Sequence, residues 1–426
     1  MIHYVDDLTI TTDKTGAREY AKVSYPIRYG VYDEIKTRDY IFQFDLRGEI
    51  KYIQGRREDW PNPAEWLKRT RGNDWIYYSS GDYNGIVGRF DEYYFPCLSY
   101  PSNSVMADEP FLSKGVQRAY VAAGRLLERT SRIGSGAVPA EIGRFLARIA
   151  AHDEKALVRR ARQFHRIIGG RVSVLPPDAR HADYEVIPLI LADGCLYNCG
   201  FCSVKAGREL TARSRADVAA QIAGLKRFYG PELQNYNALF LGQHDAMGVG
   251  ADLIECAAQS AYDSLGFEHS FMERPRLFLF GSADSLLGAK ERVFRLLDRM
   301  PFVTYINIGL ESSDAATLQF LNKPVSVGRI RDAFARMCAI NREYERIEVS
   351  ANFVIGLDLP PSHLASLSSF AKNAGGPSGG KGHFYISPMV RDSGTGREEK
   401  RALLAQFDRI KAATVLPASL YLIQRL

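Results

Sequence analysis

The amino-acid sequence predicts an α/β protein whose main part is a partial, TIM-like (β/α)6 barrel, preceded by a β-rich segment and a helical connector. From residue 184 onward, short apolar runs of strand length alternate with helical stretches, which is the pattern of parallel βαβ units. Before residue 110 the chain shows apolar-rich strands around glycine turns, and helical periodicity follows. Six curved units would fill about three quarters of an eight-unit barrel.

Composition and domain layout agree with this class. The chain has 426 residues, of which 46% are hydrophobic and 24% are charged, as in ordinary globular proteins. Its start lacks the layout of a signal peptide, and no apolar run approaches the roughly 18 residues of a membrane span. We therefore expect a cytoplasmic protein without a membrane partner. The expected division is a β-rich, aromatic-rich segment (1–110), a basic helical connector (111–180), the barrel core (181–400) and a C-terminal helix and tail (401–426).

The first 110 residues contain two candidate hairpins. Tyr40–Leu46 and Glu49–Gln54 flank a glycine turn, and Trp75–Tyr78 is expected to pair with Tyr93–Phe95. Between them, the proline-bounded stretch 59–66 predicts a turn that enters a short helix. The many Tyr and Trp side chains here favour the core of a small β domain, with a substrate-recognising lid as the alternative.

The connector is predicted to hold two helices. The first carries an apolar stripe from Leu112 to Leu127, and the second runs from Pro139 to Ile168 and ends at a glycine pair. Residues 111–180 contain 14 Lys and Arg against 5 Asp and Glu, a balance that suits phosphate groups. A solvated helix surface is the alternative, and it is favoured because the basic residues are spread around the helices rather than packed into one run.

The barrel prediction consists of six strands and the helices that follow them. The candidate strands are Tyr184–Ala192, Ala238–Leu241, Arg276–Phe280, Val303–Gly309, Glu348–Gly356 and His383–Ser387. The helices begin at Ser214 and continue with Asp252–Leu265, Ser285–Met300, Val327–Tyr344, His363–Asn373 and Arg397–Ala413. Pro188 lies inside the first strand, which predicts that this strand is an edge of the sheet.

Three cysteines follow the first strand at Cys-x3-Cys-x2-Cys spacing: Cys195, Cys199 and Cys202. A cubane iron–sulfur cluster usually takes four cysteines, so three from one loop would leave one iron open for chemistry. The alternative is a structural zinc site, which needs a closed set of four ligands. The sequence has no second cysteine pair to complete it, although a distant histidine could.

This loop resembles that of the radical S-adenosylmethionine (SAM) superfamily. The hallmark of that superfamily is Cys-x3-Cys-x-aromatic-Cys after the first strand of a partial (β/α)6 barrel, and Phe201 stands at the aromatic position. The barrel is most similar to the branch of coproporphyrinogen dehydrogenase, elongator and methylthiotransferase-type enzymes. The resemblance covers roughly residues 184–395.

The resemblance implies two cofactors, a [4Fe–4S] cluster on the three cysteines and SAM on the fourth iron. The reduced cluster would pass one electron to SAM, and the resulting 5′-deoxyadenosyl radical would abstract a hydrogen atom from the substrate. Such an enzyme is oxygen-sensitive and needs a reductant protein such as flavodoxin or ferredoxin.

Further positions fall where this superfamily binds SAM. Gly242 and Gln243 end the second strand at the place of a Gly-Gly-Glu motif, where Gln243 departs from the pattern. Glu311 and Ser312 end the fourth strand, and Asn352 belongs to the fifth. Candidate acids, bases or radical donors are His244, Asp245, Asp284 and Tyr385.

The sequence thus predicts a radical SAM enzyme that acts on a small molecule or a peptide side chain. Modification of RNA is an alternative, motivated by the basic connector. An alternative of another class is a non-catalytic protein that holds an iron–sulfur cluster or zinc for structure or binding.

Overall fold

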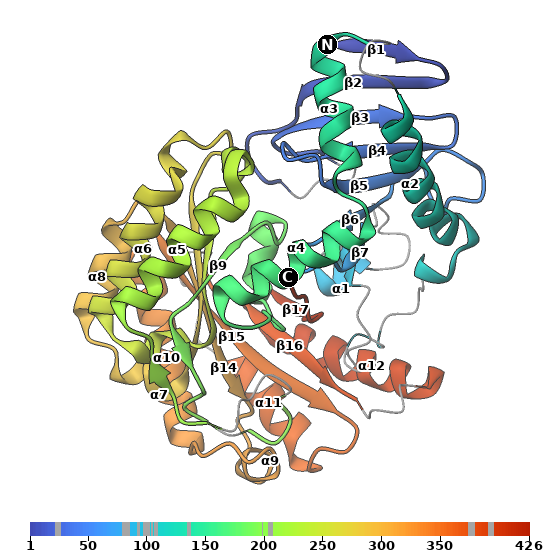
Figure 1. The fold of residues 1–426 in the computed structure, drawn as a ribbon. Helices are drawn as coiled ribbons and strands as arrows, with labels where there is room; N and C mark the ends of the chain where they lie inside the picture. The colour runs from blue at the N-terminus through green and yellow to red at the C-terminus, as the bar shows by residue number, and fades with distance from the viewer. Residues whose placement is uncertain are drawn as a thin grey trace.

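The computed structural model describes residues 1–426 except for 22–26, 79–85, 92–93, 97–102, 104, 106–109, 134–137, 198, 203–207, 374–379 and 391–395. Of Ile86, Val87, Tyr94, Phe95, Pro96 and His244, only the backbone is described. Two sheets dominate the fold, an antiparallel one formed by the N-terminal residues and a parallel one flanked by helices (Figure 1). Among the helices of the described residues, none combines the length and the apolar character that crossing a bilayer requires.

The N-terminal sheet is a meander in which each strand pairs antiparallel with the next. Its strands are β1 (Ile2–Val5), β2 (Leu8–Thr15), β3 (Val31–Lys36), β4 (Tyr40–Phe44), β5 (Ile50–Gly55), β6 (Trp66–Arg69), β7 (Trp75–Tyr78) and β8 (Tyr94–Pro96). The first predicted hairpin is confirmed as β4 with β5, and the second pairing as β7 with β8, although Tyr93 lies outside the described residues and α1 stands between these two strands. Gly48 has a φ of 87° in the first turn, a backbone conformation that suits glycine.

The short helix predicted around residue 66 is wrong, because Trp66–Arg69 is strand β6 in the middle of the sheet. The strand contains two cations, Lys68 and Arg69. Both are buried, because Lys68 pairs with Glu185 at 3.0 Å and Arg69 pairs with Glu49 at 2.7 Å. These partners lie far away in the sequence or in another strand, so local periodicity does not reveal them.

The connector holds α2 (Lys114–Arg132), α3 (Ala140–Ala150) and α4 (Glu154–Ile168), after a short helix α1 (Ile86–Phe90) and a 3-10 turn η3 (Pro110–Leu112). The second predicted helix is thus two helices. Asp153 separates them as the N-cap of α4, accepting a hydrogen bond from the Ala156 amide at 2.7 Å. Gly169 ends α4 in the left-handed conformation, at the predicted position.

In the described part of the chain, seven parallel strands form the second sheet, in the order β17-β16-β15-β14-β13-β12-β9. They are β9 (Ile187–Ile190), β12 (Ala238–Asp245), β13 (Arg276–Ser282), β14 (Val303–Glu311), β15 (Ile347–Gly356), β16 (Phe384–Met389) and β17 (Ala418–Leu420). The first six confirm the predicted strands, and Pro188 lies in the edge strand β9, as expected. The last strand, β17, was not predicted.

Helices connect these strands and cover the sheet. They are α5 (Arg215–Tyr229), η5 (Gly230–Asn235), η6 (Ala246–Val249), α6 (Ala251–Leu265), η7 (Phe267–His269), α7 (Ala283–Gly288), α8 (Glu291–Arg299), α9 (Ala315–Phe320), α10 (Val327–Glu343), α11 (Ser362–Asn373) and α12 (Arg397–Ala413). The predicted helix over 285–300 is split into α7 and α8 at Ala289 and Lys290, and α9 was not predicted. The partial barrel with its β-rich N-terminal part is nevertheless the predicted fold class.

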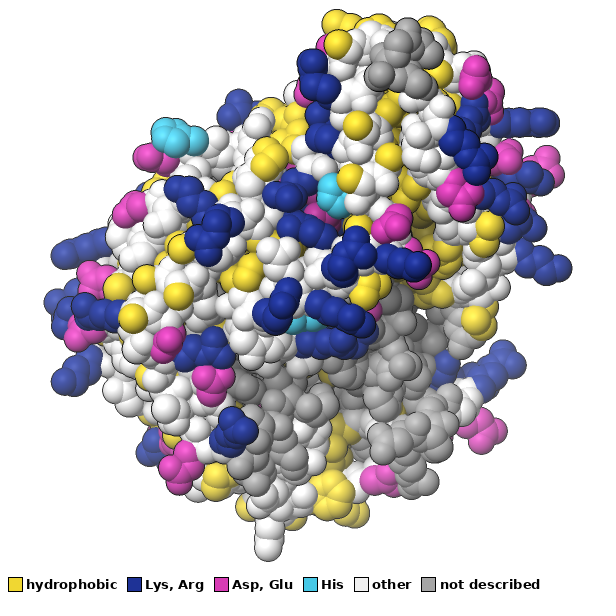
Figure 2. All heavy atoms as spheres, in the orientation of Figure 1, with side chains coloured by type: hydrophobic (Ala, Val, Ile, Leu, Met, Phe, Trp, Pro, Cys, Tyr) yellow, Lys and Arg dark blue, Asp and Glu magenta, His cyan; other side chains and the backbone are white. Residues whose placement is uncertain are grey.

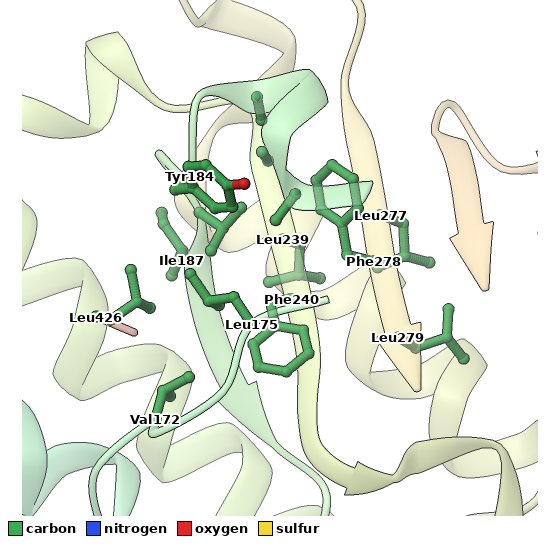
Figure 3. Close-up of a cluster of buried hydrophobic side chains, with 14 of the residues drawn as sticks. Val172, Leu175, Tyr184, Ile187, Leu239, Phe240, Leu277, Phe278, Leu279 and Leu426 are labelled. Atoms are coloured by element: carbon green, nitrogen blue, oxygen red, sulfur yellow. The ribbon is translucent and has the colours of Figure 1, made fainter. Parts of the chain in front are cut away.

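The two edges of the parallel sheet are linked by the C-terminal tail and residues 172–175. The Tyr421 amide donates to the Ile386 carbonyl of β16 at 2.8 Å, and the Leu175 amide donates to the Gln424 carbonyl at 2.9 Å. Figure 3 shows Leu426 and Val172 beside Ile187 and Leu239 in the apolar core below the sheet edge. The opening between β9 and β17 is therefore filled by segments that follow and precede the barrel.

A set of buried ion pairs joins the N-terminal sheet to the barrel, and we call it the junction network. Arg71 pairs with Asp45 at 2.7 Å and with Glu232 of η5 at 3.2 Å. Glu49 pairs with Arg69 at 2.7 Å and with Arg160 of α4 at 2.8 Å. Further pairs include Lys51–Glu185 and Lys68–Glu185 at 3.3 and 3.0 Å.

Candidate functional site

A cavity of about 550 Å³ opens at the carboxyl ends of the parallel strands. In α/β barrels this end carries the active site. The lining comes from the cysteine loop, from strand ends and from the C-terminal tail. It consists of Val174, Cys195, Leu196, Tyr197, Cys199, Gly200, Phe201, Cys202, Gln243, Asp245, Phe280, Gly281, Ser282, Gly309, Glu311, Lys323, Asn352, Val354, Ser387, Pro388, Met389, Val390, Tyr421 and Ile423.

The cysteine loop is held at its base and at its tip. At the base, β10 (Ala192–Asp193) pairs antiparallel with β11 (Thr211–Ala212), and the Cys195 amide donates to the Arg208 carbonyl at 3.1 Å. Near the tip, the Gly200 amide donates to the carbonyl of Leu321 at 2.8 Å. These hydrogen bonds hold the described residues around Cys195 and Gly200 in place, whereas residues 198 and 203–207 of the loop lie outside the described residues.

Arg213 ties the same base to the end of α4. Its guanidinium forms two hydrogen bonds with the Asp193 carboxylate, at 2.8 and 2.7 Å, and donates to the Ile168 carbonyl at 2.9 Å. The following Ser214 caps α5 through a reciprocal pair of hydrogen bonds with Asp217. Arg213 is thus a structural clamp between the connector and the cysteine loop.

Asp284, a candidate acid, lies outside the cavity lining. It accepts the hydroxyl of Tyr197, which stands between the first two cysteines, and it accepts Arg329 Nε at 2.6 Å. Burial and the hydrogen bond to Asp284 raise the pKa of Tyr197 above its ordinary value. In the structure, Asp284 anchors the cysteine loop to α7 and α10.

The three loop cysteines all line the cavity and are free thiols. Burial raises the pKa of Cys195, and it raises the pKa of Cys199 to about 11. Among the described residues, no three His, Cys, Asp or Glu side chains converge on one point as ligands of a single metal ion. A cubane cluster does not need such convergence, because each thiolate binds its own iron. Three thiols on one loop facing one cavity therefore fit a cluster as donors.

Asp245 supplies a carboxylate to the cavity. The residue is only 6% exposed, and neither carboxylate oxygen has a hydrogen-bond partner of ordinary geometry among the described residues. Burial raises its pKa, although the hydroxyls of Ser282 and Ser285 and the backbone amides of Ser282 and Gly248 lie close enough to oppose this. Buried carboxylates without a partner are rare, because desolvation of the charge is not offset. Asp245 is therefore suited to receive a cationic group from a ligand.

Gln243 uses its side chain to hold the cavity wall. Its Oε1 accepts the Ser173 amide at 2.8 Å and the Ser173 hydroxyl at 3.2 Å. This fastens the segment that contains Val174 to the end of β12. Gly242 is not among the lining residues, and a Cβ there would meet the Phe240 ring at 2.0 Å, so glycine permits this backbone path. The side chain of His244 lies outside the described residues.

Glu311 and Lys323 form a buried pair on the cavity wall. Lys323 Nζ lies 3.2 Å from Glu311 Oε1 and sits over the Tyr197 ring, 5.2 Å from its centroid. Glu311 has a φ of 65°, a conformation that is uncommon for residues other than glycine and that is often found at functional sites. A Cβ on Gly309 would meet Glu311 Oε1 at 2.4 Å, so this glycine leaves the space that the carboxylate occupies.

The other predicted residues divide between the wall and the interior. Asn352 lines the cavity and exchanges amide hydrogen bonds with Asn307. Ser312 is buried behind Glu311, and its hydroxyl is 2.9 Å from His363 Nδ1. Tyr385 lies deeper in the barrel and donates to Asp178 of the 3-10 turn η4 (Pro177–Ala182) at 2.8 Å. Neither Ser312 nor Tyr385 is among the residues that line the cavity.

Several lining residues were not anticipated from the sequence, among them Lys323, Val174, Tyr421 and Ile423. Lys323 follows a short helix in a segment without periodicity, so no local pattern marks it. The apolar run Leu420–Ile423 has strand composition and could have predicted β17 with a continuation beside the barrel. Its place at the cavity depends on the pairing of β17 with β16.

No protein-family model and no curated protein matches the chain. Solved structures that it resembles include a radical SAM methyltransferase from Sphaerobacter thermophilus, at 14% identity over 55% of this chain and 65% of that chain, with a TM-score of 0.39. SuiB of Streptococcus suis matches at 12% identity over 83% of this chain and 70% of that one, with a TM-score of 0.36.

The cobalamin-dependent SAM radical enzyme OxsB matches at 15% identity over 56% of this chain, with a TM-score of 0.34. The chain spans 65% of the methyltransferase and 33% of OxsB, less than two thirds of each. At TM-scores and identities this low, these likenesses establish neither a family nor an activity for this chain.

Proposed function

We propose that the chain is a radical SAM enzyme in which Cys195, Cys199 and Cys202 hold a [4Fe–4S] cluster and Asp245 receives the amino group of SAM. One observation carries this proposal. Three free thiols and an unpartnered buried carboxylate line one cavity at the carboxyl ends of a parallel sheet. Thiolates are the ligands of iron–sulfur clusters, and a carboxylate is the natural acceptor of an ammonium group.

The cysteine loop would provide three ligands and leave one iron without a protein ligand. When bound, the cluster and SAM together supply a carbon-centred radical that can abstract a hydrogen atom from a substrate. The protein contributes position and exclusion of water. Hydrogen bonds at the base and tip of the loop hold the thiols, and Val354 and Met389 give the opposite wall an apolar surface.

Asp245 would bind the positively charged ammonium group of SAM through its negatively charged carboxylate. Burial raises the pKa of Asp245 and disfavours its ionised form. A bound cation reverses this balance, because opposite charges at short range stabilise each other most where water is excluded. Asp245 then has the role that the acidic residue of the Gly-Gly-Glu motif has in the resemblance.

Glu311, Lys323 and Asn352 would orient the rest of SAM. Lys323 neutralises Glu311 in the apo cavity, so the pair adds hydrogen-bonding groups to the wall without adding net charge. Asn352 exchanges two amide hydrogen bonds with Asn307, which hold its side chain in place at the cavity wall. A one-electron reductant protein such as flavodoxin or ferredoxin would complete the reaction.

The test is anaerobic reconstitution with iron and sulfide, followed by incubation with SAM and a strong reductant. We expect roughly four irons per chain and formation of 5′-deoxyadenosine. An intact cluster without any cleavage of SAM would contradict the proposal. Purified protein that contains zinc instead of iron, and that does not take up a cluster, would favour a non-catalytic metal-binding protein.

A further inference from the structure

The outer face of α4 carries a row of positive charges. Lys155, Arg159, Arg162 and Arg166 follow at intervals of four, three and four residues, which places them on one side of an α-helix. All four are exposed, and none has an ion pair or hydrogen bond with a described residue. Arg160 faces the other way and pairs with Glu49 at 2.8 Å. We call the four exposed residues the α4 row.

Helix α5 extends this basic surface sideways. The two helices pack closely, since a Cβ on Gly224 of α5 would meet Ile167 Cγ2 of α4 at 2.8 Å. Exposed cations on α5 are Arg215, Lys226 and Arg227. Together α4 and α5 carry eight Lys and Arg against two Asp and Glu. Figure 2 shows Lys and Arg side chains gathered over this part of the molecule, with a few acidic side chains between them.

The basic surface leads to the cavity. Helix α4 ends at Ile168, and the chain continues through the exposed Arg171 to Val174, which lines the cavity. Three extended residues span roughly 10 Å, so Arg171 lies within about that distance of the cavity wall. Arg213 also binds the end of α4 to the base of the cysteine loop.

The composition of this surface favours phosphate groups as its partner. Most of its cations are arginines, whose planar guanidinium groups match phosphate oxygens in pairs. Both helices are described throughout, and none of the strongly exposed large apolar side chains lies on either of them. Protein interfaces usually have aromatic and large apolar residues at their centre, whereas contacts to nucleic-acid backbones are made mostly by cations.

The length of the row also suits a polyanion. From Lys155 to Arg166 a helix rises about 17 Å, which equals the axial length of about five phosphates in one strand of a duplex. The sequence had favoured a small molecule or peptide over RNA because its basic residues form no single run. The fold places four of them on one helical face instead.

We infer that the α4 row and the adjacent cations of α5 bind the phosphodiester backbone of a nucleic-acid strand and present one nucleotide to the cavity. The binding step stands on the surface alone. The presentation of a nucleotide as the substrate rests on the proposed function of the cavity.

The test measures binding of fluorescent 20-residue oligouridine and oligothymidine to the reconstituted full chain, at several salt concentrations. The variant replaces Lys155, Arg159, Arg162 and Arg166 by Gln. The matched control replaces Lys290, Arg295, Arg299 and Arg342 by Gln, four exposed cations of α8, α10 and the residue before α8 that make no ion pair with a described residue. Both variants lose four charges. Thermal unfolding checks that both still fold.

We expect the α4 variant to bind oligouridine at least tenfold more weakly at 50 mM salt, and the control to bind like the unmodified chain. The slope of log K against log salt should fall by about 3 in the α4 variant, because each lost contact to a single strand changes it by roughly 0.7. Equal weakening in both variants, or no binding of either oligomer by the unmodified chain, would overturn the inference. Tighter binding of labelled polyglutamate than of the oligomers would overturn it in favour of an acidic protein partner.

The same titrations distinguish RNA from DNA as the bound strand. Binding of both oligomers supports backbone recognition, and preference for oligouridine identifies RNA. The result is separable from the proposed chemistry, since SAM cleavage is measured without nucleic acid. A chain that binds the oligomers but does not cleave SAM would disprove the proposed function and leave the basic surface as a binding site.

Discussion

Buried charges are paired in one region of the molecule and unpaired in another. In the junction network, Arg71 lies within 4 Å of Asp45, Glu49 and Glu232. In the cavity, Asp245 is buried to a similar degree and has no such cation among the described residues. In both regions, burial of charged groups costs free energy because water is removed from them. Only in the junction network do opposite charges within the fold offset this cost.

The difference separates a structural from a ligand-binding use of buried polarity. A network whose charges pair within the chain orients two parts of the fold, although burial still raises the pKa of Glu232 in it to about 7. A carboxylate without a partner destabilises the empty protein and is stabilised when a cation arrives.

Replacement of a cavity cysteine should abolish function without harming the fold. We expect Cys199→Ala to lower the iron content well below the roughly four irons of the cluster and to reduce SAM cleavage more than 1000-fold, because one iron loses its ligand. Iron analysis and 5′-deoxyadenosine formation measure this. The control is Cys338→Ala, a buried cysteine of α10, which should keep both. Full activity of Cys199→Ala would remove the cysteine loop from the mechanism.

Removal of one cation from the junction network should lower the free energy of unfolding. We expect Arg71→Met to lower the free energy of unfolding by about 3–5 kcal/mol, because Asp45 and Glu232 are then left buried without this partner. Urea denaturation measures it. Arg425→Met is the matched control, since its pair with Asp74 is partly exposed and should contribute only about 0–1 kcal/mol. Equal effects of the two substitutions would mean that burial of the pair does not matter.

The same type of change at the cavity should affect the ligand rather than the fold. We expect Asp245→Asn to weaken SAM binding about 10- to 100-fold, equivalent to ~1.5–3 kcal/mol for a hydrogen bond to a charged group. The free energy of unfolding should stay equal or rise, because an unpartnered carboxylate is removed. Isothermal calorimetry and urea denaturation measure the two quantities.

The control for this change is Asp178→Asn, at a buried carboxylate that accepts Ser350 at 2.7 Å and Tyr385 at 2.8 Å. This substitution should lower the free energy of unfolding by about 1 kcal/mol, since one of two accepted hydrogen bonds is lost, and should leave SAM binding unchanged. Loss of stability in Asp245→Asn, with unchanged SAM affinity, would reverse the assignment of the two carboxylates.

Acid should weaken the junction network, which should keep its full contribution to stability at neutral pH. Burial alone would raise the pKa of Glu49, but Arg69, Arg71 and Arg160 outweigh it and hold this pKa below its ordinary value of 4.5. A depressed carboxylate pKa stabilises the fold above the unfolded value, and this contribution is lost as pH falls toward the folded pKa. The loss from this group should begin near pH 4.5 and reach up to about 1.4 kcal/mol per pH unit.

Urea denaturation between pH 6 and pH 3.5 measures this acid dependence. Arg160→Gln removes one of the three guanidinium groups near Glu49 and should make the loss shallower, because the pKa of Glu49 is then depressed less. An unchanged slope in this variant would show that other carboxylates control the acid response.

Regular alternation made the barrel predictable from the sequence. Strands such as Arg276–Ser282 and Val303–Glu311 are mostly buried, and their composition marks them. The antiparallel sheet was harder. β6 contains Lys68 and Arg69, whose partners come from other elements, and its sequence therefore resembles a solvated turn.

The candidate site was predictable where a motif is local. The three cysteines and Phe201 stand together in the sequence, and Gln243, Asp245, Glu311 and Asn352 come from strand ends that a parallel sheet brings to one edge. Lys323, Tyr421 and Ile423 reach the cavity through loop and tail paths. Their positions depend on contacts between distant segments, which no local pattern encodes.

By itself, the sequence determined the order of strand–helix units and the position of three thiols at the end of the first barrel strand. Both follow from local spacing, because periodicity and turn chemistry act over a few residues. Only the tertiary structure decided that Asp245 has no cation beside it among the described residues while Arg71 has three carboxylates, and that the basic face of α4 stays exposed. Pairing and exposure depend on which distant segments meet, and that is a property of the packed molecule.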